Sequence, residues 1–266
     1  MIRASSLPFL LYFIPALLAQ DAYLLPERFT LAPGESCELA LHGGDFFPAS
    51  EYATAVEALT RGRLSTGAAL RDWQEAGDRT VTQLTAPARA GSFYAAVETL
   101  AQLRELEADD FEAYLADEGA METIEWRSRQ GEARRPGREL IRRSAKTLLV
   151  AGEAGGAVEK PLGQPLEIVP LKNPALLRAG EVLPLRVVFR GAALRGALVN
   201  VRWVDASGKM GSLAAGPTDA RGGTSVRLEA GVWKLHTLRL MRRLDRREAD
   251  WDTYSASLTF EVRSQR

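Results

Sequence analysis

The sequence predicts a mainly β protein, with two antiparallel β-sandwich domains and a short helical insert. Three observations predict this fold class. Short segments rich in Val, Leu, Phe and Trp recur along the chain, many with alternating apolar and polar residues. Turn signals containing Gly and Pro separate them at short intervals, as in sandwiches. One charged stretch, 104–145, has helical spacing instead. The 266 residues are enough for about two domains.

Composition narrows the function classes. Hydrophobic residues make up 46% and charged residues 26% of the chain, which are ordinary globular values. Lys plus Arg and Asp plus Glu number 34 each, so no overall field attracts nucleic acid, and we predict no nucleic-acid partner. Cys37 is the single cysteine, which excludes an internal disulfide and a CxxC zinc site.

Residues 1–19 have the pattern of an export signal. Arg3 is the only charged residue before Asp21, and the run from Leu7 to Leu18 is almost wholly apolar. As a helix this run is about 18 Å long, short of the roughly 30 Å hydrocarbon core of a bilayer. We therefore predict cleavage after Ala19, a periplasmic location and no transmembrane span in the mature chain. An uncleaved anchor is the alternative.

The first predicted domain covers 20–150 and begins with a strand, a turn and a strand. The turn is Ala32-Pro33-Gly34-Glu35, and Cys37, Leu39 and Leu41 then alternate with polar or small residues. Further short strands are predicted over four segments: 53–59, 68–74, 79–84 and 91–103.

The helical insert is predicted over 104–145. Asp109 can cap a helix in which Phe111, Tyr114 and Leu115 have i, i+3, i+4 spacing. A second short helix runs to Gly131, and Pro136 can open a third. Acidic residues dominate the first half of the insert and basic residues the second, so mutual attraction favours their packing together. A docking face for a partner protein is the alternative.

Gly and Pro make 151–163 a linker, and the second predicted domain follows over 164–266. Within it, Asp219 to Gly222 has the composition of a turn stabilised by the Asp side chain. Strands are predicted over six segments: 166–169, 183–189, 198–204, 225–228, 232–240 and 255–262.

Four segments carry a family resemblance: Ala19-Gln-Asp-Ala-Tyr-Leu-Leu-Pro, Asp110-Phe-Glu-Ala-Tyr-Leu-Ala-Asp-Glu-Gly, Arg143-Ser-Ala-Lys-Thr-Leu-Leu-Val-Ala-Gly and Asp250-Trp-Asp-Thr-Tyr-Ser-Ala-Ser-Leu-Thr-Phe-Glu-Val. In this order they resemble an exported family of unknown function linked to the NikM-type nickel/cobalt uptake component. Thr218-Asp-Ala-Arg-Gly with Gly231-Val-Trp is also similar to prealbumin-like, carboxypeptidase-regulatory-like β-sandwiches. The resemblance implies a periplasmic accessory protein that handles nickel or cobalt for a membrane transporter.

The mature start departs from the family pattern. The family begins with a sequence like Ala-His-Asp-Phe-Trp-Leu, whereas this chain has Ala19-Gln20-Asp21-Ala22-Tyr23-Leu24. An N-terminal His offers an amine and an imidazole to nickel or copper, and Gln20 offers no imidazole. This difference favours a second hypothesis, a periplasmic interaction or scaffold module without metal or catalytic activity.

Candidate metal ligands are few. His42 and Asp45 are close in sequence beside Gly43-Gly44, and His236 shares a strand face with Lys234. The structural alternatives are a turn at the end of a strand for His42 and Asp45, and a core position for His236. The sequence has no GxSxG, GxxxxGK or GxGxxG motif, and we predict that the protein is not an enzyme. No catalytic residue and no resident cofactor are predicted; nickel or cobalt would be cargo.

Overall fold

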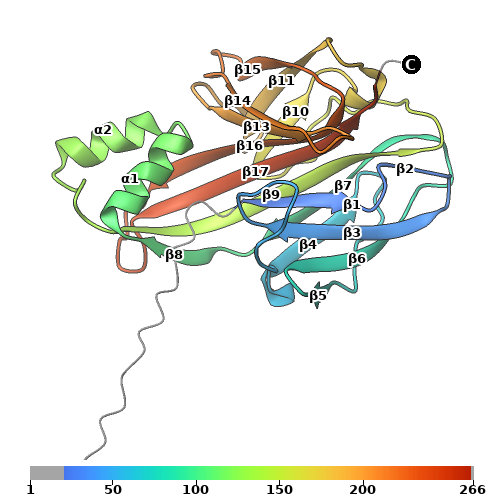
Figure 1. The fold of residues 1–266 in the computed structure, drawn as a ribbon. Coiled ribbons are helices and arrows are strands. Elements are labelled where there is room, and N and C mark those ends of the chain that lie inside the picture. The colour runs from blue at the N-terminus through green and yellow to red at the C-terminus, as the bar shows by residue number, and fades with distance from the viewer. Residues whose placement is uncertain (1–20, 265–266) are drawn as a thin grey trace, which may run out of the picture.

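The computed structural model describes residues 21–264, and within them the protein is mainly β, with three sheets and two α-helices (Figure 1). The predicted signal peptide, 1–19, lies outside the described residues. The predicted fold class is confirmed. No helix in the described part of the chain is long and apolar enough to cross a bilayer.

The largest sheet joins the two halves of the chain. Its path is β14 (Met210–Ala215), β13 (Val199–Val204), β16 (Gly231–Arg242), β17 (Trp251–Val262), β9 (Gly137–Ala151), β7 (Gly91–Thr99) and β4 (Leu59–Leu64), with β2 (Thr30–Leu31) and β8 (Gln102–Leu106) also on β9. At its centre β17 and β9 run parallel, from Trp251 beside Glu139 to Thr259 beside Thr147. The sheet is therefore mixed, and strands from both predicted domains share it. The division into domains at 151–163 stays a prediction.

Two smaller sheets cover opposite faces of this central sheet. The first contains β1 (Ala22–Pro26), β3 (Ser36–Gly43), β6 (Arg79–Thr85) and β5 (Gln74–Ala76); the second contains β10 (Leu166–Pro170), β11 (Val182–Phe189), β12 (Ala192–Ala193) and β15 (Gly223–Arg227). Successive side chains of a strand point to opposite faces. Accordingly, Leu149 of β9 belongs to the core under the first sheet, and its neighbour Leu148 belongs to the core under the second.

The helices α1 (Ala108–Asp117) and α2 (Met121–Arg129) lie beside the ends of β16 and β17 (Figure 1). Phe111, Tyr114 and Leu115 are buried as their spacing predicts, and they pack against Trp251 in a third core cluster. A Cβ on Gly137 would lie 2.2 Å from the Phe111 ring, so glycine permits this close approach. Short 3-10 turns occur at Val56–Ala58 and Pro174–Leu176.

The helical insert is shorter than the predicted 104–145. Residues up to Leu106 form β8, and the third helix predicted after Pro136 is wrong because β9 begins at Gly137. The sequence at the start of β9 has many polar residues and, taken alone, resembles a helix. In the structure these residues pair with neighbouring strands of the sheet. Glu139, for example, is fully buried and bonds to Arg104 and Thr253. Strand pairing here overrides the local pattern.

Two predicted strands of the first half are also wrong. Residues 53–58 form an irregular segment and the first 3-10 turn, and most of 68–74 forms no strand, since β5 starts at Gln74. The predicted linker is largely correct in its local structure: residues 152–165 form neither helix nor strand.

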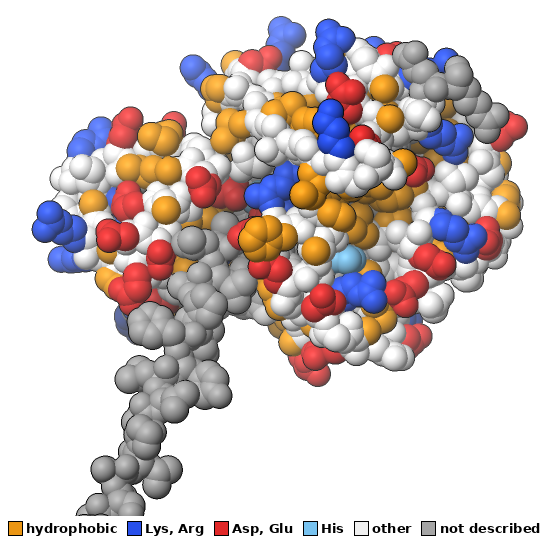
Figure 2. Space-filling view, in the orientation of Figure 1, with side chains coloured by type: hydrophobic (Ala, Val, Ile, Leu, Met, Phe, Trp, Pro, Cys, Tyr) orange, Lys and Arg blue, Asp and Glu red, His pale blue; other side chains and the backbone are white. Residues whose placement is uncertain are grey.

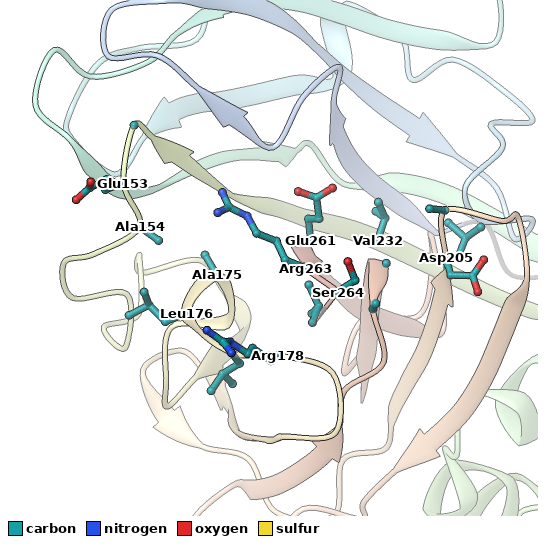
Figure 3. A pocket seen from close by; sticks show the side chains of 17 residues that line it. Glu153, Ala154, Ala175, Leu176, Arg178, Asp205, Val232, Glu261, Arg263 and Ser264 are labelled. Carbon is teal, nitrogen blue, oxygen red and sulfur yellow. The ribbon is translucent and has the colours of Figure 1, made fainter. Parts of the chain in front are cut away.

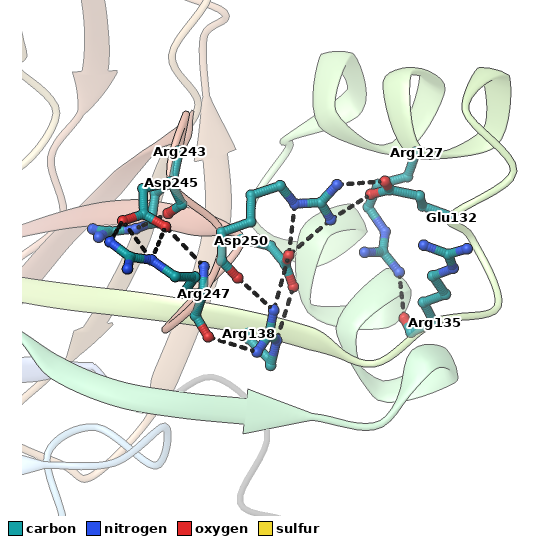
Figure 4. A network of polar contacts seen from close by, with 9 residues as sticks. Arg127, Glu132, Arg135, Arg138, Arg243, Asp245, Arg247 and Asp250 are labelled. Atoms are coloured by element: carbon teal, nitrogen blue, oxygen red, sulfur yellow. Dashed lines mark hydrogen bonds and ion pairs between the residues drawn. The ribbon is translucent and has the colours of Figure 1, made fainter.

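Ion pairs connect the helical part of the chain to the hairpin between β16 and β17 (Figure 4). Arg246 Nη1 lies 2.7 Å from Glu132 Oε1, and Arg246 Nη2 lies 2.7 Å from Asp250 Oδ1. Arg138 contacts the same Asp250, with 3.2 Å between Nε and Oδ2. Side chains of both signs also cover the outer surface of the helical part (Figure 2). These contacts show that part of the insert's charge is structural.

Candidate functional site

A cavity of about 590 Å³ lies where three parts of the chain meet: the start of β1, the C-terminal end of α1 and the strands β13, β14 and β16. Its polar lining is Asp21, Asp45, Tyr114, Asp117, Glu118, Asn200, Arg202, Ser212, Lys234 and His236. The cavity therefore combines residues from both predicted domains and from the helical insert.

His236, on β16, is 2% exposed and lies between two carboxylates. Its Nε2 is 3.0 Å from Asp21 Oδ1, and its Nδ1 is 3.2 Å from Glu118 Oε2. Neither nitrogen has the angular geometry of a hydrogen bond with these or other described atoms. Burial alone would lower the pKa of His236, but the charges of Asp21 and Glu118 outweigh burial and raise it.

Asp21 uses its second oxygen to hold a buried lysine. Lys234 Nζ donates to Asp21 Oδ2 at 2.5 Å, and the Lys234 side chain is almost completely buried. The same ammonium lies 4.7 Å from the centre of the Tyr23 ring. Burial would raise the pKa of Asp21, but the charges of His236 and Lys234 lower it on balance. Asp21 therefore stays ionised, with Oδ1 directed at His236.

Glu118 reaches the cavity because α1 ends at this residue. Its backbone N–H donates to Tyr114 O, and Gly119 then turns the chain with a left-handed φ of 68°. The side chain of Asn200 on β13 fixes the carboxylate, with Nδ2 3.0 Å from Glu118 Oε2. The helical insert thus positions Glu118 beside His236.

Asp21, Glu118 and His236 form the one group of three or more His, Cys, Asp or Glu residues in 21–264 whose ligand atoms could hold a metal, all within 4.8 Å of one another. Two ligand atoms about 2.1 Å from a metal and about 90° apart lie about 3.0 Å from each other. The 3.0 Å between Asp21 Oδ1 and His236 Nε2 fits this requirement. Glu118 then faces the other ring nitrogen, as carboxylates behind metal-bound histidines do.

The structure brings two of the three predicted ligands to this cavity. Asp45 lines it outside the group of three, and burial first, then the charge of Asp21, raises the pKa of Asp45 to about 7. His42 does not line the cavity. It lies on β3 beside Tyr23, with 5.3 Å between the stacked rings. Burial first, then the charge of Arg79, lowers the pKa of His42 to about 4, so its ring is neutral at pH 7.

Three residues of the site were not predicted from the sequence: Asp21, Glu118 and Lys234. A signal existed for each: Asp21 follows the predicted cleavage site, Glu118 ends the acidic run, and Lys234 shares a strand face with His236. What was missing was their meeting point, since the contact between Asp21 and Lys234 joins residues 213 positions apart.

A larger hollow of about 940 Å³ lies near the C-terminal end of the described chain (Figure 3). Its charged side chains include Glu153, Arg178, Asp205, Glu261 and Arg263. In Figure 3 these side chains do not converge on one point, and Glu153 and Asp205 lie at opposite sides of the view. The smaller cavity at His236 is therefore the better candidate site.

Comparisons with known proteins give a family and no function. No curated protein matches the chain. Among solved structures, the adhesin FdeC of Escherichia coli is similar at 15% identity and TM-score 0.26, over 90% of this chain and 65% of FdeC. The D0–D1 region of intimin matches at 10% identity and TM-score 0.24, over 92% and 100%. The adhesin InvE of Yersinia pseudotuberculosis matches at 13% and 0.24, over 91% and 59%.

These TM-scores are too low to carry an argument about fold or function. The chain spans about two thirds of the FdeC chain that it matches. The family comparison is different in extent, because a single family model matches residues 17–240, most of the chain. The chain belongs to that family, the domain of unknown function DUF4198.

Proposed function

We propose that this protein is an exported binding or accessory module that carries a divalent transition metal, nickel or cobalt, as cargo for a membrane uptake system. One observation carries the proposal: Asp21 Oδ1 and His236 Nε2 lie 3.0 Å apart in a cavity at the junction of three chain segments. Imidazole and carboxylate donors suit nickel and cobalt, and the usual order of affinities places nickel above cobalt.

In this proposal the metal bonds to Asp21 and His236, while two other residues hold these ligands in place. The carboxylate of Glu118 faces the ring at Nδ1, 3.2 Å away, and Lys234 holds the other oxygen of Asp21. The lysine also competes with the metal for the charge of Asp21. Such competition suits a carrier that must release its cargo to a partner.

Calorimetric titration of the purified protein with nickel and cobalt tests the proposal. We expect a Kd in the micromolar range, which corresponds to a binding free energy of roughly −8 kcal/mol, and nickel should bind more tightly than cobalt. His236→Gln should abolish binding, and Glu118→Gln should weaken it about tenfold or more because the negative charge behind the ring is lost. His42→Gln is the matched control and should bind as the unchanged protein does. No binding by the unchanged protein, or equal loss in both histidine variants, would contradict the proposal.

A second candidate function is an interaction module without metal. The specific observation in its favour is the charge balance of the cluster: Lys234 and a protonated His236 together compensate Asp21 and Glu118. In that case the cluster is an ionic lock between the helical insert and the sheets. Titration without any binding, combined with a lower melting temperature for His236→Gln, supports this alternative.

Export is part of the proposal and has its own test. Because the apolar run ends just before Ala19, we expect the protein in the periplasmic fraction to begin at Gln20. N-terminal sequencing, or mass spectrometry if Gln20 has cyclised, measures this directly. A full-length product in the cytoplasm contradicts it.

A further inference from the structure

A second cavity, of about 790 Å³, opens where the turn between β11 and β12 meets the central sheet. Its charged lining residues are Arg61 on β4, Arg142 on β9, Arg190 in the turn and Glu98 on β7. This volume lies in the range of small-molecule sites, roughly 300–1,000 Å³.

Two guanidinium groups converge on one ring in this cavity. Tyr254 of β17 is nearly buried, and the guanidinium carbons of Arg142 and Arg190 each lie 5.5 Å from its ring centre. Arg190 also donates from Nη2 to the Tyr254 hydroxyl at 2.9 Å and lies over the ring of Phe189 at 5.0 Å. These contacts hold like charges close together and leave further N–H donors for a ligand.

The backbone at Arg190 provides a separate observation. Arg190 and Gly191 form a two-residue hairpin turn in which both φ values are positive, 50° and 79°. Such turns strongly prefer Asn or Asp before Gly, because other side chains are strained in this conformation. The turn alone does not explain an arginine here. A side chain that is strained locally but well placed over a cavity is typical of a binding position.

Positive charge is in excess around the cavity. Glu98 is paired with Arg63, with 3.6 Å between Nη1 and Oε1. Asp252 is the ion-pair partner of Arg142 at 3.2 Å, but it is shared with Arg243 at 2.8 Å. Within 21–264, Arg61 and Arg190 have no carboxylate ion-pair partner. The excess positive charge around the cavity therefore favours an anionic ligand.

We propose that this cavity binds a small molecule that carries oxyanion groups, either carboxylates or a phosphate, through Arg61, Arg142 and Arg190. Guanidinium groups bind both kinds of oxyanion with paired N–H donors. Arg142 and Arg190 both contact the Tyr254 ring, and the exposed Arg61 lines the cavity from β4. This anion site is separate from the proposed metal site, since the two cavities share no lining residue.

Calorimetry in metal-free buffer, with citrate and inorganic phosphate as separate probes, tests the site. We expect at least one probe to bind at micromolar to millimolar concentration, more weakly as salt is raised. The probe that binds more tightly identifies the oxyanion class. Arg190→Gln and Arg61→Gln should each weaken binding at least tenfold, and Arg190→Lys should restore part of it. His236→Gln should bind the probe unchanged, which separates this result from the metal proposal.

Arg221→Gln is the matched control, since Arg221 is an exposed arginine of another turn that does not line the cavity. It should bind as the unchanged protein does. If Arg190→Gln unfolds, Arg61→Gln still decides the question, because Arg61 is exposed on β4. The proposal is overturned if neither probe binds at millimolar concentration, or if Arg221→Gln weakens binding as much as Arg61→Gln.

Discussion

The surroundings of the two histidines differ although both residues are buried on strands. His42 stacks on Tyr23, and burial lowers its pKa to about 4, so its ring is a neutral core group at pH 7. His236 lies between Asp21 and Glu118, whose charges raise its pKa despite deeper burial. The comparison teaches that burial does not decide the role of a histidine. The carboxylates brought to its ring by distant parts of the chain decide it.

The largest expected effect comes from removing the carboxylate of Asp21, which contacts both His236 and Lys234. Asp21→Ala leaves Lys234 and His236 buried without this counter-charge, so we expect the free energy of unfolding to fall by about 3–5 kcal/mol. Urea denaturation at pH 7 measures it. Asp45→Ala, on the wall of the same cavity, is the control and should cost much less. Equal losses would show that Asp21 has no special electrostatic role.

Acid should destabilise the protein through His42 and not through His236. The folded pKa of His42, about 4, is below its unfolded value of about 6.5, so stability falls as pH drops from 6.5 to 4, by up to about 3 kcal/mol. His236 has the opposite sign: its contribution is complete below pH 6.5 and is lost as pH rises through its raised pKa.

Urea denaturation across pH, with and without His42→Gln, checks this difference. The free energy of unfolding of the unchanged protein, relative to that of the variant, should fall between pH 6.5 and 4, because Asp45, with its raised pKa, titrates in both proteins and His42 in one. NMR titration of the ring protons should place His42 below 6.5 and His236 above it. If both histidines titrate near pH 6.5, the predicted difference between their surroundings is wrong.

A smaller effect should follow from Gly119→Ala. Gly119 has a left-handed φ, and a Cβ there would lie 2.8 Å from Leu198 Cβ, so we expect a loss of about 1–2 kcal/mol. Because Gly119 positions Glu118, metal affinity should fall as well, whereas the pKa of His42 should stay the same. Gly131→Ala, also at a positive φ but with open space around it, is the control and should leave metal affinity unchanged.

The smallest expected effect is that of a cut in the segment after β9. Proteolysis within 152–163 should leave the two fragments associated, because β9 and β17 pair over nine residues on opposite sides of the cut. Size-exclusion chromatography of the nicked protein measures this, and His236 should keep its raised pKa. Separation of the fragments would instead favour two independent domains.

The sequence predicts the fold class and the buried face of α1 well because these depend on local patterns. The predicted cap at Asp109 is wrong, since α1 begins at Ala108 and Asp109 lies in its first turn. Phe111, Tyr114 and Leu115 define one buried helix face, and Cys37, Leu39 and Leu41 of β3 are buried in one core cluster. The first residues of β9 were predicted wrongly as helix. Glu139 is a charged residue that can be buried here only because Arg104 and Thr253 bind its carboxylate. Nor does any local pattern indicate that β9 and β17 are parallel neighbours.

The candidate site was predicted only in part for the same reason. His236 is visible as a histidine on a strand that also carries Lys234. Its partners depend on a turn after α1 and on the chain entering β1, neither of which is near it in sequence. His42 and Asp45 are close in sequence, yet only Asp45 lines the cavity. Proximity along the chain was therefore a poor guide to ligand geometry.

The parallel contact between β9 and β17 also determines when the protein can fold. β17 is the last strand of the described chain, and it fills the gap between β9 and β16 in the central sheet. Until β17 has emerged, those two long strands present open edges, which readily pair with other chains. Folding that needs contacts so distant in sequence is slow. If the protein is exported as we propose, it would complete its sheet only after nearly all of the chain had crossed the membrane, and protection by a chaperone would matter most in that interval.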